Sequence, residues 1–407
     1  MIDLTNKADV PSLGLGYLRP DGGKGIRNVV LVAYLVECAR HVAQKIVQQF
    51  DEQEVHLIGF SGCYPNKYAE TMMKALCTHA NVGAVLLLSL GCESFNGKGL
   101  LETVQATQRP VKLIGIQETG GTGKAIAAGK AFIQQVQNQI KSCARIPLTW
   151  SDLIVGVVSG GSDATSGITA NPAAGLAFDK LVSLGASTIF ENTGEMVGLE
   201  DDLKRRATRS DLGIELKRTI EKAAAFYEAM GHGSFAPGNA EGGLSTLEEK
   251  SIGAYCKSGS APIVGLLKPG DKPTVPGLYL MDIVPDGKPT FGFPNPNDIS
   301  EINELIASGA QCVLFTTGRG SVAGSAIAPV IKIMANPENY YRMEENMDIN
   351  AGKILQDEAS LDDIANEIVA KIQQVVAGEK TKAEQLGHFE FSLAYKFFEP
   401  LGPSCLA

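Results

Sequence analysis

The chain has 407 residues, of which 44% are hydrophobic, and this length allows two or three domains with ordinary buried cores. Its net charge of -9 at pH 7 argues against nucleic acid as a bulk electrostatic partner, although a few local Arg or Lys residues can still bind an anionic substrate. Eight dispersed cysteines without a CxxC pair indicate reduced thiols. No secretion signal and no membrane-spanning apolar run is visible, so we expect a cytoplasmic protein with no membrane partner.

Short apolar runs alternate with helical stretches along the whole chain. Strands are predicted at 55–60, 82–90, 111–117, 153–158, 188–191, 262–267, 277–282 and 312–317, and the run at 29–35 predicts either a strand or the start of a buried helix. Helices are predicted at 67–78, 122–141, 173–185, 199–230, 298–309 and 361–376. This rhythm predicts an α/β protein with two parallel-sheet, doubly wound units. We expect an N-terminal α/β domain over 1–150 and a C-terminal α/β domain over 151–407.

Glycine-containing loops follow four of the predicted strands, at 61–63, 91–93, 118–124 and 159–163. Ligands of parallel α/β sheets bind at such carboxyl-end loops, which converge on one edge if the strands are neighbours. Cys63 and Cys92 each come directly after a glycine, and Glu93 follows Cys92. Each cysteine is either a small hydrophobic residue or, with Glu93, part of a soft site for iron or zinc. Five scattered histidines do not support a His-rich metal cluster.

The two other loops offer polar contacts to a small ligand. The glycine loop 118–124 lacks the first glycine and the Ser/Thr of a phosphate loop, so nucleotide binding is not supported. Its backbone at Gly121 either donates N–H groups to a carboxylate or forms an ordinary turn. The 160–163 loop, with Ser162, Asp163 and the nearby Asn171, suits hydroxyl recognition, although Asp163 is equally suited to capping a helix.

Two later segments carry candidate cations. Thr246 and Glu249 have the spacing of a capping box, and Lys250 and Lys257 are seven residues apart on the predicted helix face. A lysine in a partly buried cleft can act as a base, whereas the same charges can be purely structural. Arg319 follows a predicted strand in a glycine frame and is either a carboxylate clamp or one half of a surface ion pair.

Several motifs taken together resemble one enzyme family. They lie at 16–22 and 25–28, which contain Arg19, Arg27 and Asn28, and at 90–93, 160–172, 238–250, 315–320 and 347–352. In these stretches the chain is similar to the altronate/galactarate dehydratase family, which also contains sulfolactate sulfo-lyase large subunits. It departs from the family pattern at Ser159, where a Cys is usual, at Gly59, where a His is usual, and at Gly23, where an Arg is usual.

The resemblance implies a lyase that dehydrates a small sugar acid or related hydroxy-carboxylate and uses a divalent metal, typically Fe2+. Two other readings stay open, a sulfo-lyase releasing sulfite and a metal-free member that serves as a binding subunit. Family members that are single chains carry a small SAF-type domain, so a separate small SAF-domain subunit and an oligomeric assembly are expected as partners. As a hypothesis for this reaction, we assign Lys250, Glu249 and Asp163 as catalytic residues, with Lys250 removing the proton. We assign Cys63, Cys92 and Glu93 to the metal, and the substrate-binding residues are predicted to be Arg19, Arg27, Asn28, Gly121, Ser162, Asn171, Asn239, Lys257 and Arg319.

Overall fold

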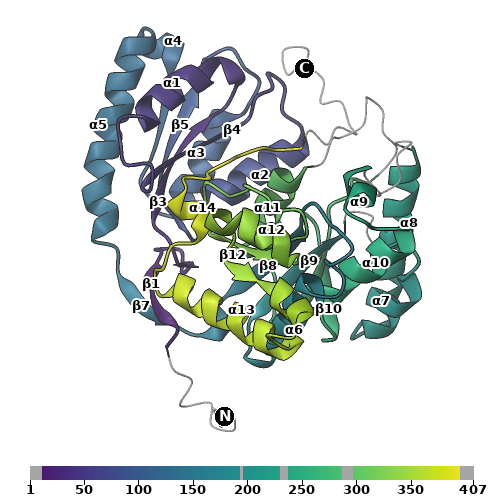
Figure 1. Cartoon of the computed structure of the whole chain (residues 1–407). Coiled ribbons are helices and arrows are strands. Elements are labelled where there is room, and N and C mark those ends of the chain that lie inside the picture. Colours follow the sequence, from purple (N-terminus) through teal and green to yellow (C-terminus); the bar gives the residue numbers. More distant parts are fainter. Residues whose placement is uncertain (1–11, 193–195, 230–236, 287–296, 395–407) are drawn as a thin grey trace.

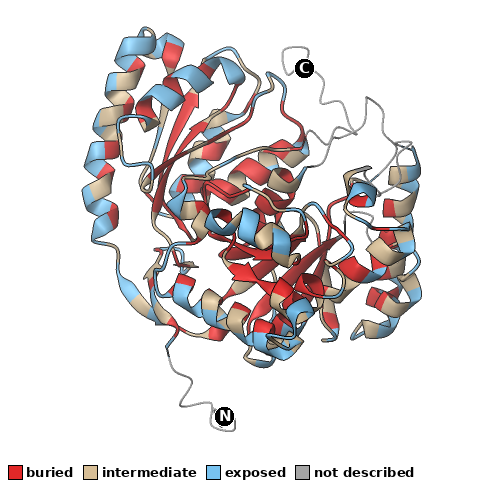
Figure 2. Cartoon of the chain, viewed as in Figure 1, coloured by how far each residue is buried: buried red, intermediate tan, exposed pale blue. Residues whose placement is uncertain are grey.

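The computed structural model describes residues 12–192, 196–229, 237–286 and 297–394. It confirms an α/β protein with two parallel sheets, one in the upper part of Figure 1 and one in the lower part. Buried residues are concentrated on the strands and on the helix faces turned toward them (Figure 2). No helix in the described ranges is long and apolar enough to cross a membrane.

The first sheet has four parallel strands in the order β4-β3-β5-β6. These strands are β3 (Val29–Tyr34), β4 (Val55–Gly59), β5 (Val82–Ser89) and β6 (Val111–Gly115). Helices α1 (Glu37–Val47) and α5 (Thr122–Lys141) pack on one face, while α2 (Lys67–Cys77) and α3 (Gly97–Ala106) pack on the other. Because both faces are covered, the strands are apolar almost without interruption.

The second sheet has seven parallel strands in the order β10-β11-β9-β8-β12-β13-β14. These strands are β8 (Ile154–Ser159), β9 (Ser187–Asn192), β10 (Ile263–Leu267), β11 (Gly277–Asp282), β12 (Cys312–Thr317), β13 (Val330–Met334) and β14 (Ile349–Asn350). Helices α6 (Ala170–Ser183) and α13 (Leu361–Val376) pack on one face, and α11 (Asp298–Ala307) packs on the other. The chain builds the sheet outward from β8 through β9 on one side and through β12 on the other. The topological switch point therefore lies between β8 and β12.

One hydrophobic core joins the two sheets. It combines side chains of α2 with side chains of α11, and the Tyr68 hydroxyl donates to Glu304 Oε1 at 2.5 Å across that contact. Near the C-terminal end, α14 (Lys382–Gln385) packs beside β13 and contacts the amino edge of the first sheet through Glu384, and apolar side chains of residues 386–394 pack against the shared core. The division of the chain into domains at 150/151 stays a prediction.

Some elements differ from those that the sequence patterns predict. A small antiparallel sheet of β2 (Lys24–Gly25), β1 (Gly14–Leu18) and β7 (Arg145–Leu148) was not predicted, and neither were α1, α3, β13 and β14. Helix α1 has no capping side chain, because Val36 precedes it. The single helical region predicted over 199–230 is two helices, α7 (Glu200–Arg206) and α8 (Ser210–Ala229), separated where Ala207 bridges to Ile263 of β10. That long-range backbone pairing leaves no local signal in the sequence.

Candidate active site

The carboxyl ends of β8 and β12 lie side by side at the switch point of the second sheet. Ser159 pairs with Thr316 in the strand register, and Gly160 N donates to Thr316 O at 2.9 Å. Beyond the strands, the backbone N–H groups of Gly318 and Arg319 both donate to Gly161 O, at 3.0 and 3.1 Å. The two loops therefore form one rigid edge at the position where parallel α/β sheets bind ligands.

Asp163 shapes the first of these loops. Its Oδ1 accepts hydrogen bonds from Thr165 N at 2.9 Å and from Thr165 Oγ1 at 2.6 Å, and its Oδ2 accepts one from Asn336 Nδ2 at 3.0 Å. A Cβ on Gly318 would come within 2.1 Å of Asp163 Oδ1, so only glycine fits opposite it. Asp163 is not a helix cap, because α6 begins after Thr169. Its buried carboxylate closes the turn after β8 and ties it to the turn after β13.

A buried lysine reaches this edge from outside the sheet. Lys257 follows α10 (Leu247–Cys256) and is 0% exposed, and its Nζ lies 2.9 Å from Ser159 Oγ. The neighbouring hydroxyl of Thr316 is also buried and has no hydrogen-bond partner within the described residues. An amine and two hydroxyls thus gather where β8 and β12 end.

Packing of α10 against α6 brings Lys257 to this position. A Cβ on Gly175 of α6 would lie 2.0 Å from the carbonyl oxygen of Cys256, so the close approach of the two helices requires glycine. The segment after Lys257 is held by Asp179 of α6, whose carboxylate accepts hydrogen bonds from Ser260 N and Ala261 N at 2.8 Å each. These contacts fix the backbone on both sides of Lys257.

Arg319 lies at the outer rim of the same edge. Its side chain is 41% exposed, its Nη1 donates to Gly238 O, and it forms an ion pair with Glu241 at 3.3 Å. Within the described part of the chain its Nε and Nη2 make no hydrogen bond, so they are available to a carboxylate. Asn239, buried on α9 (Pro237–Glu241), and the buried Ser162 complete the rim.

Sequence comparison identifies the family of proteins to which this chain is related. A family model described as D-galactarate/altronate dehydratase, C-terminal, matches residues 150–398, and one described as D-galactarate dehydratase/altronate hydrolase, second domain, matches residues 16–141. The chain belongs to this dehydratase family. It is therefore a lyase, as the resemblance implies.

Three relatives in this dehydratase family show how far the similarity extends. Altronate dehydratase of Bacillus subtilis is 29% identical over 91% of this chain and 75% of its own length. The (2R)-sulfolactate sulfo-lyase subunit beta of Chromohalobacter salexigens is 30% identical over 93% of this chain and 96% of its own length. Galactarate dehydratase (L-threo-forming) of Escherichia coli is 32% identical over 75% of this chain and 58% of its own length.

Not every predicted site residue lies at the β8–β12 edge. Asn171 is buried on α6, and its Nδ2 donates to Gly253 O of α10 at 3.0 Å. Glu249 caps the first turn of α10, because its carboxylate accepts hydrogen bonds from Ser245 N and Ser245 Oγ at 2.7 and 2.6 Å. These hydrogen bonds lower the pKa of Glu249. Lys250 is half-buried one residue further along α10, and its part in catalysis stays a prediction.

Arg19, Arg27 and Asn28 lie instead before β3, at the amino edge of the first sheet. Arg19 is buried, which lowers its pKa to about 10, and it donates to Ala80 O at 2.6 Å and to Asn28 Oδ1 at 2.7 Å. Arg27 holds both carboxylate oxygens of Glu384, at 2.6 and 2.9 Å. These contacts join parts of the fold, and a substrate role for the three residues stays a prediction.

Cys63, Cys92, Glu93 and Gly121 follow strands of the first sheet or the short helix after β6, whereas the candidate active site is on the second sheet. Both cysteines are exposed. Their loops are adjacent, because Ser94 N donates to Cys63 O at 2.9 Å. The carboxylate of Glu93 accepts the N–H of Gly91 at 2.8 Å. Its pKa is lowered, because hydrogen bonds from Ser89 and from its own loop outweigh the effect of burial, which would raise it.

These residues do not by themselves fit a metal ion. In the described residues, no three His, Cys, Asp or Glu side chains come together in a way that could hold one. The expected divalent metal, Fe2+, stays a prediction, and no catalytic step is derived through it. Iron analysis of protein purified without air, with Cys63→Ser and Cys92→Ser beside the natural chain, tests the predicted ligands.

The structure also places residues near the site that sequence reasoning did not select. Glu191, 1% exposed, stands next to last in β9, which neighbours β8. Asn336 reaches Asp163 from the turn after β13, and Asn339 Nδ2 donates to Gly318 O at 2.8 Å. The sequence could have indicated Glu191 as a site residue, because a carboxylate inside an apolar strand is unusual. The two asparagines have no comparable local pattern.

Proposed function

We propose that the chain dehydrates a small sugar acid or a related hydroxy-carboxylate at the β8–β12 edge. The observation that carries the proposal is the fully buried amine of Lys257, 2.9 Å from Ser159 Oγ at the switch point of the second sheet. Relatives named altronate dehydratase and galactarate dehydratase support this class of substrate. The half-exposed Arg319 supplies a cation at the rim of the same edge.

Dehydration of a 2,3-dihydroxy acid breaks a C–H bond beside the carboxylate and a C–O bond at the neighbouring carbon. In this proposal Lys257 accepts the proton, since a buried lysine amine can serve as a base. The free Nε and Nη2 of Arg319 bind the carboxylate, whose negative charge spreads as the proton leaves. Ser162 and Asn239 hold hydroxyl groups, and the departing hydroxide takes up the proton that Lys257 accepted, so water leaves and the amine is restored. The enol product then rearranges to a 2-oxo acid.

A second candidate reaction releases sulfite from sulfolactate. The observation that favours it is the similarity to the sulfo-lyase subunit beta, which covers 93% of this chain at 30% identity. The same carbanion forms beside the carboxylate, but sulfite leaves in place of hydroxide. This reaction needs a further cation for the sulfonate group, in addition to the one that binds the carboxylate.

We also propose that the active enzyme contains a second, small polypeptide of the SAF type. The support is that the relative from Chromohalobacter salexigens is named as one subunit of its enzyme. If the small partner completes the site, the chain purified alone folds but turns over poorly. Full turnover by the lone chain, unchanged by adding the partner, contradicts this part of the proposal.

A substrate panel distinguishes the candidate reactions. Aldonates, aldarates and sulfolactate are each incubated with the chain, with and without a co-expressed small SAF-domain protein. Formation of a 2-oxo acid without sulfite supports the dehydratase, and stoichiometric sulfite supports the sulfo-lyase. If no panel member is turned over under anaerobic conditions with Fe2+ and the partner present, the proposed substrate class is wrong.

A further inference from the structure

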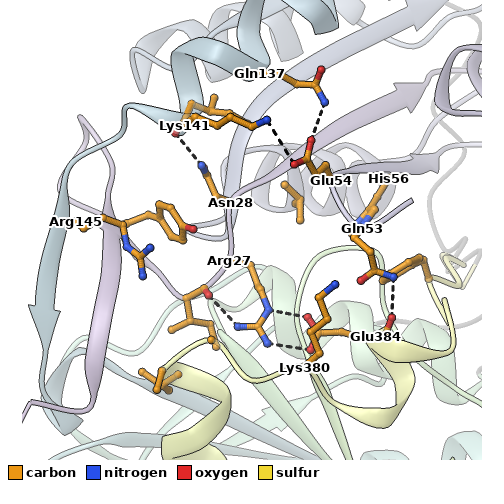
Figure 3. A pocket seen from close by; sticks show the side chains of 18 residues that line it. Arg27, Asn28, Gln53, Glu54, His56, Gln137, Lys141, Arg145, Lys380 and Glu384 are labelled. Atoms are coloured by element: carbon orange, nitrogen blue, oxygen red, sulfur yellow. Dashed lines mark hydrogen bonds and ion pairs between the residues drawn. The ribbon is translucent and has the colours of Figure 1, made fainter. Parts of the chain in front are cut away.

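A polar cavity lies at the amino edge of the first sheet, away from the loops that form the candidate active site. Its volume is about 480 Å3, which falls within the usual range for small-molecule sites. One wall comes from β1, the start of β3 and the end of α5, and the other from the turn between α13 and α14 (Figure 3). The proposed dehydration uses no group in this cavity.

Cationic side chains outnumber carboxylates around the cavity. Arg27, Lys141, Arg145 and Lys380 line it together with Glu54 and Glu384. This excess of positive charge stands out in a chain whose net charge is -9. A concave surface with charge of one sign attracts ligands of the opposite sign.

Both carboxylates already have partners inside the protein. Glu384 is held by Arg27 through both oxygens, at 2.6 and 2.9 Å. Glu54 accepts a hydrogen bond from Gln137 at 2.9 Å and lies 3.7 Å from the amine of Lys141. These pairs leave the charges of Lys380 and Arg145 unmatched by any lining carboxylate.

Lys380 and Arg145 retain donors for a ligand. Within the described residues the amine of Lys380 makes no ion pair or hydrogen bond, and Figure 3 shows Lys380 on the opposite side of the cavity from Lys141. The guanidinium of Arg145 stacks over the ring of Tyr17 at 4.4 Å and uses Nη2 for Leu15 O at 2.5 Å. Its Nε and Nη1 have no protein partner within the described residues.

We propose that this cavity binds a small dianion, whose two negative charges are bound by Lys380 and Arg145. Phosphate and dicarboxylate groups share the chemistry that these donors recognise. The two cations come from segments 235 residues apart in the chain, one beside the first sheet and one on the α13–α14 turn. An occupant therefore ties the turn to the first sheet and stabilises the folded chain through mass action.

Isothermal titration calorimetry of the whole chain tests the proposal, because it needs no turnover and does not depend on the proposed reaction. The probes are inorganic phosphate, pyrophosphate and succinate at low ionic strength. Saturable binding of the phosphates alone identifies a phosphate site, binding of succinate alone identifies a dicarboxylate site, and binding of both identifies a general dianion site. No saturable binding of any probe at millimolar concentration overturns the proposal.

Two matched variants locate the binding site. Lys380→Ala is expected to weaken Kd about tenfold, because it removes one charged hydrogen-bond donor, while Lys380→Arg retains binding. Lys45→Ala removes the same charge from the exposed side of α1 and is expected to leave Kd unchanged. Equal effects of Lys380→Ala and Lys45→Ala would show that binding depends only on net charge, which contradicts a built site.

Hydrogen exchange gives a second readout that does not depend on a variant. A dianion that contacts Lys380 is expected to slow amide exchange over residues 376–389, which contribute the second wall of the cavity. Protection confined to the β8–β12 loops would place the ligand at the candidate active site and refute the cavity as its site.

Discussion

The substitution Lys257→Met tests whether the buried amine takes part in the reaction. Met has a comparable length and keeps the volume filled, but it removes the amine that lies 2.9 Å from Ser159 Oγ. A positioned acid or base contributes roughly 10²- to 10⁴-fold to rate, so kcat is expected to fall by that factor. The loss corresponds to about 3 to 5 kcal/mol of activation free energy.

The same substitution has a smaller expected effect on stability. Losing the hydrogen bond with Ser159 costs about 0.5 to 1.5 kcal/mol, but an apolar side chain at this 0% exposed position has no polar amine to desolvate. These two contributions oppose each other, so they partly cancel. The free energy of unfolding is expected to change by less than about 2 kcal/mol.

The assay measures 2-oxo acid formation from the preferred substrate over a range of concentrations, with urea denaturation of each variant alongside. The matched control is Lys250→Met, which is half-buried and lies seven residues earlier, within α10. If Lys257 and not Lys250 accepts the proton, Lys250→Met should keep most of its kcat. A Lys257→Met enzyme that stays folded and retains most of its kcat, beside a Lys250→Met enzyme that is inactive, would reverse the assignment.

Three further substitutions test other parts of the structure. Arg319→Ala is expected to raise KM about tenfold or more, because it removes the cation that binds the carboxylate. It is expected to lower the unfolding free energy by less than about 1 kcal/mol, because the ion pair of Arg319 with Glu241 is exposed. An unchanged KM with reduced stability would show that Arg319 forms only a surface ion pair. Arg27→Ala leaves Glu384 without its partner in a pair whose side chains are 15% and 13% exposed, so urea denaturation should show a loss of about 3 to 5 kcal/mol, and a loss below about 1 kcal/mol would contradict this. Burial lowers the pKa of Lys332 from 10.5 to about 8 in the folded chain. Between pH 8 and pH 10.5, Lys332 therefore binds a proton in the unfolded chain and has lost it in the folded chain. The unfolding free energy should therefore rise with pH over that window, and the rise should be smaller in Lys332→Met, as pH-dependent denaturation would reveal.

Local patterns in the sequence predicted much of the secondary structure. The apolar runs that became β3, β4, β5, β8 and β12 are short and are bounded by glycine or polar residues, and their ends were predicted to within a few residues. The elements that were missed have weaker local signals. Strand β13 contains Lys332, and α1 follows β3 with only two residues between them and no capping side chain.

The roles of individual polar residues were harder to derive, because each partner is far away in the chain. The spacing of Lys250 and Lys257 predicts one helix face, but α10 ends at Cys256, so Lys257 turns inward to Ser159 while Lys250 stays on the helix. Asp163 was predicted to be a helix cap or a hydroxyl ligand. It is not a cap, because its carboxylate accepts hydrogen bonds from its own turn and from Asn336, 173 residues further along, and its role toward a hydroxyl stays a prediction.

By itself, the sequence determined the alternation of strands and helices, the glycine loops that end β8 and β12, and the motifs of the dehydratase family. Hydrophobic periodicity and turn chemistry act over a few residues, so they can be read locally. Only the tertiary structure decided that β12 pairs with β8 across more than 150 residues of chain and that Arg27 holds Glu384. Such contacts depend on which hydrophobic faces bury one another, and several strand orders would bury the same apolar runs equally well. The site follows from the strand order, because the switch point exists only once β9 and β12 have taken opposite sides of β8.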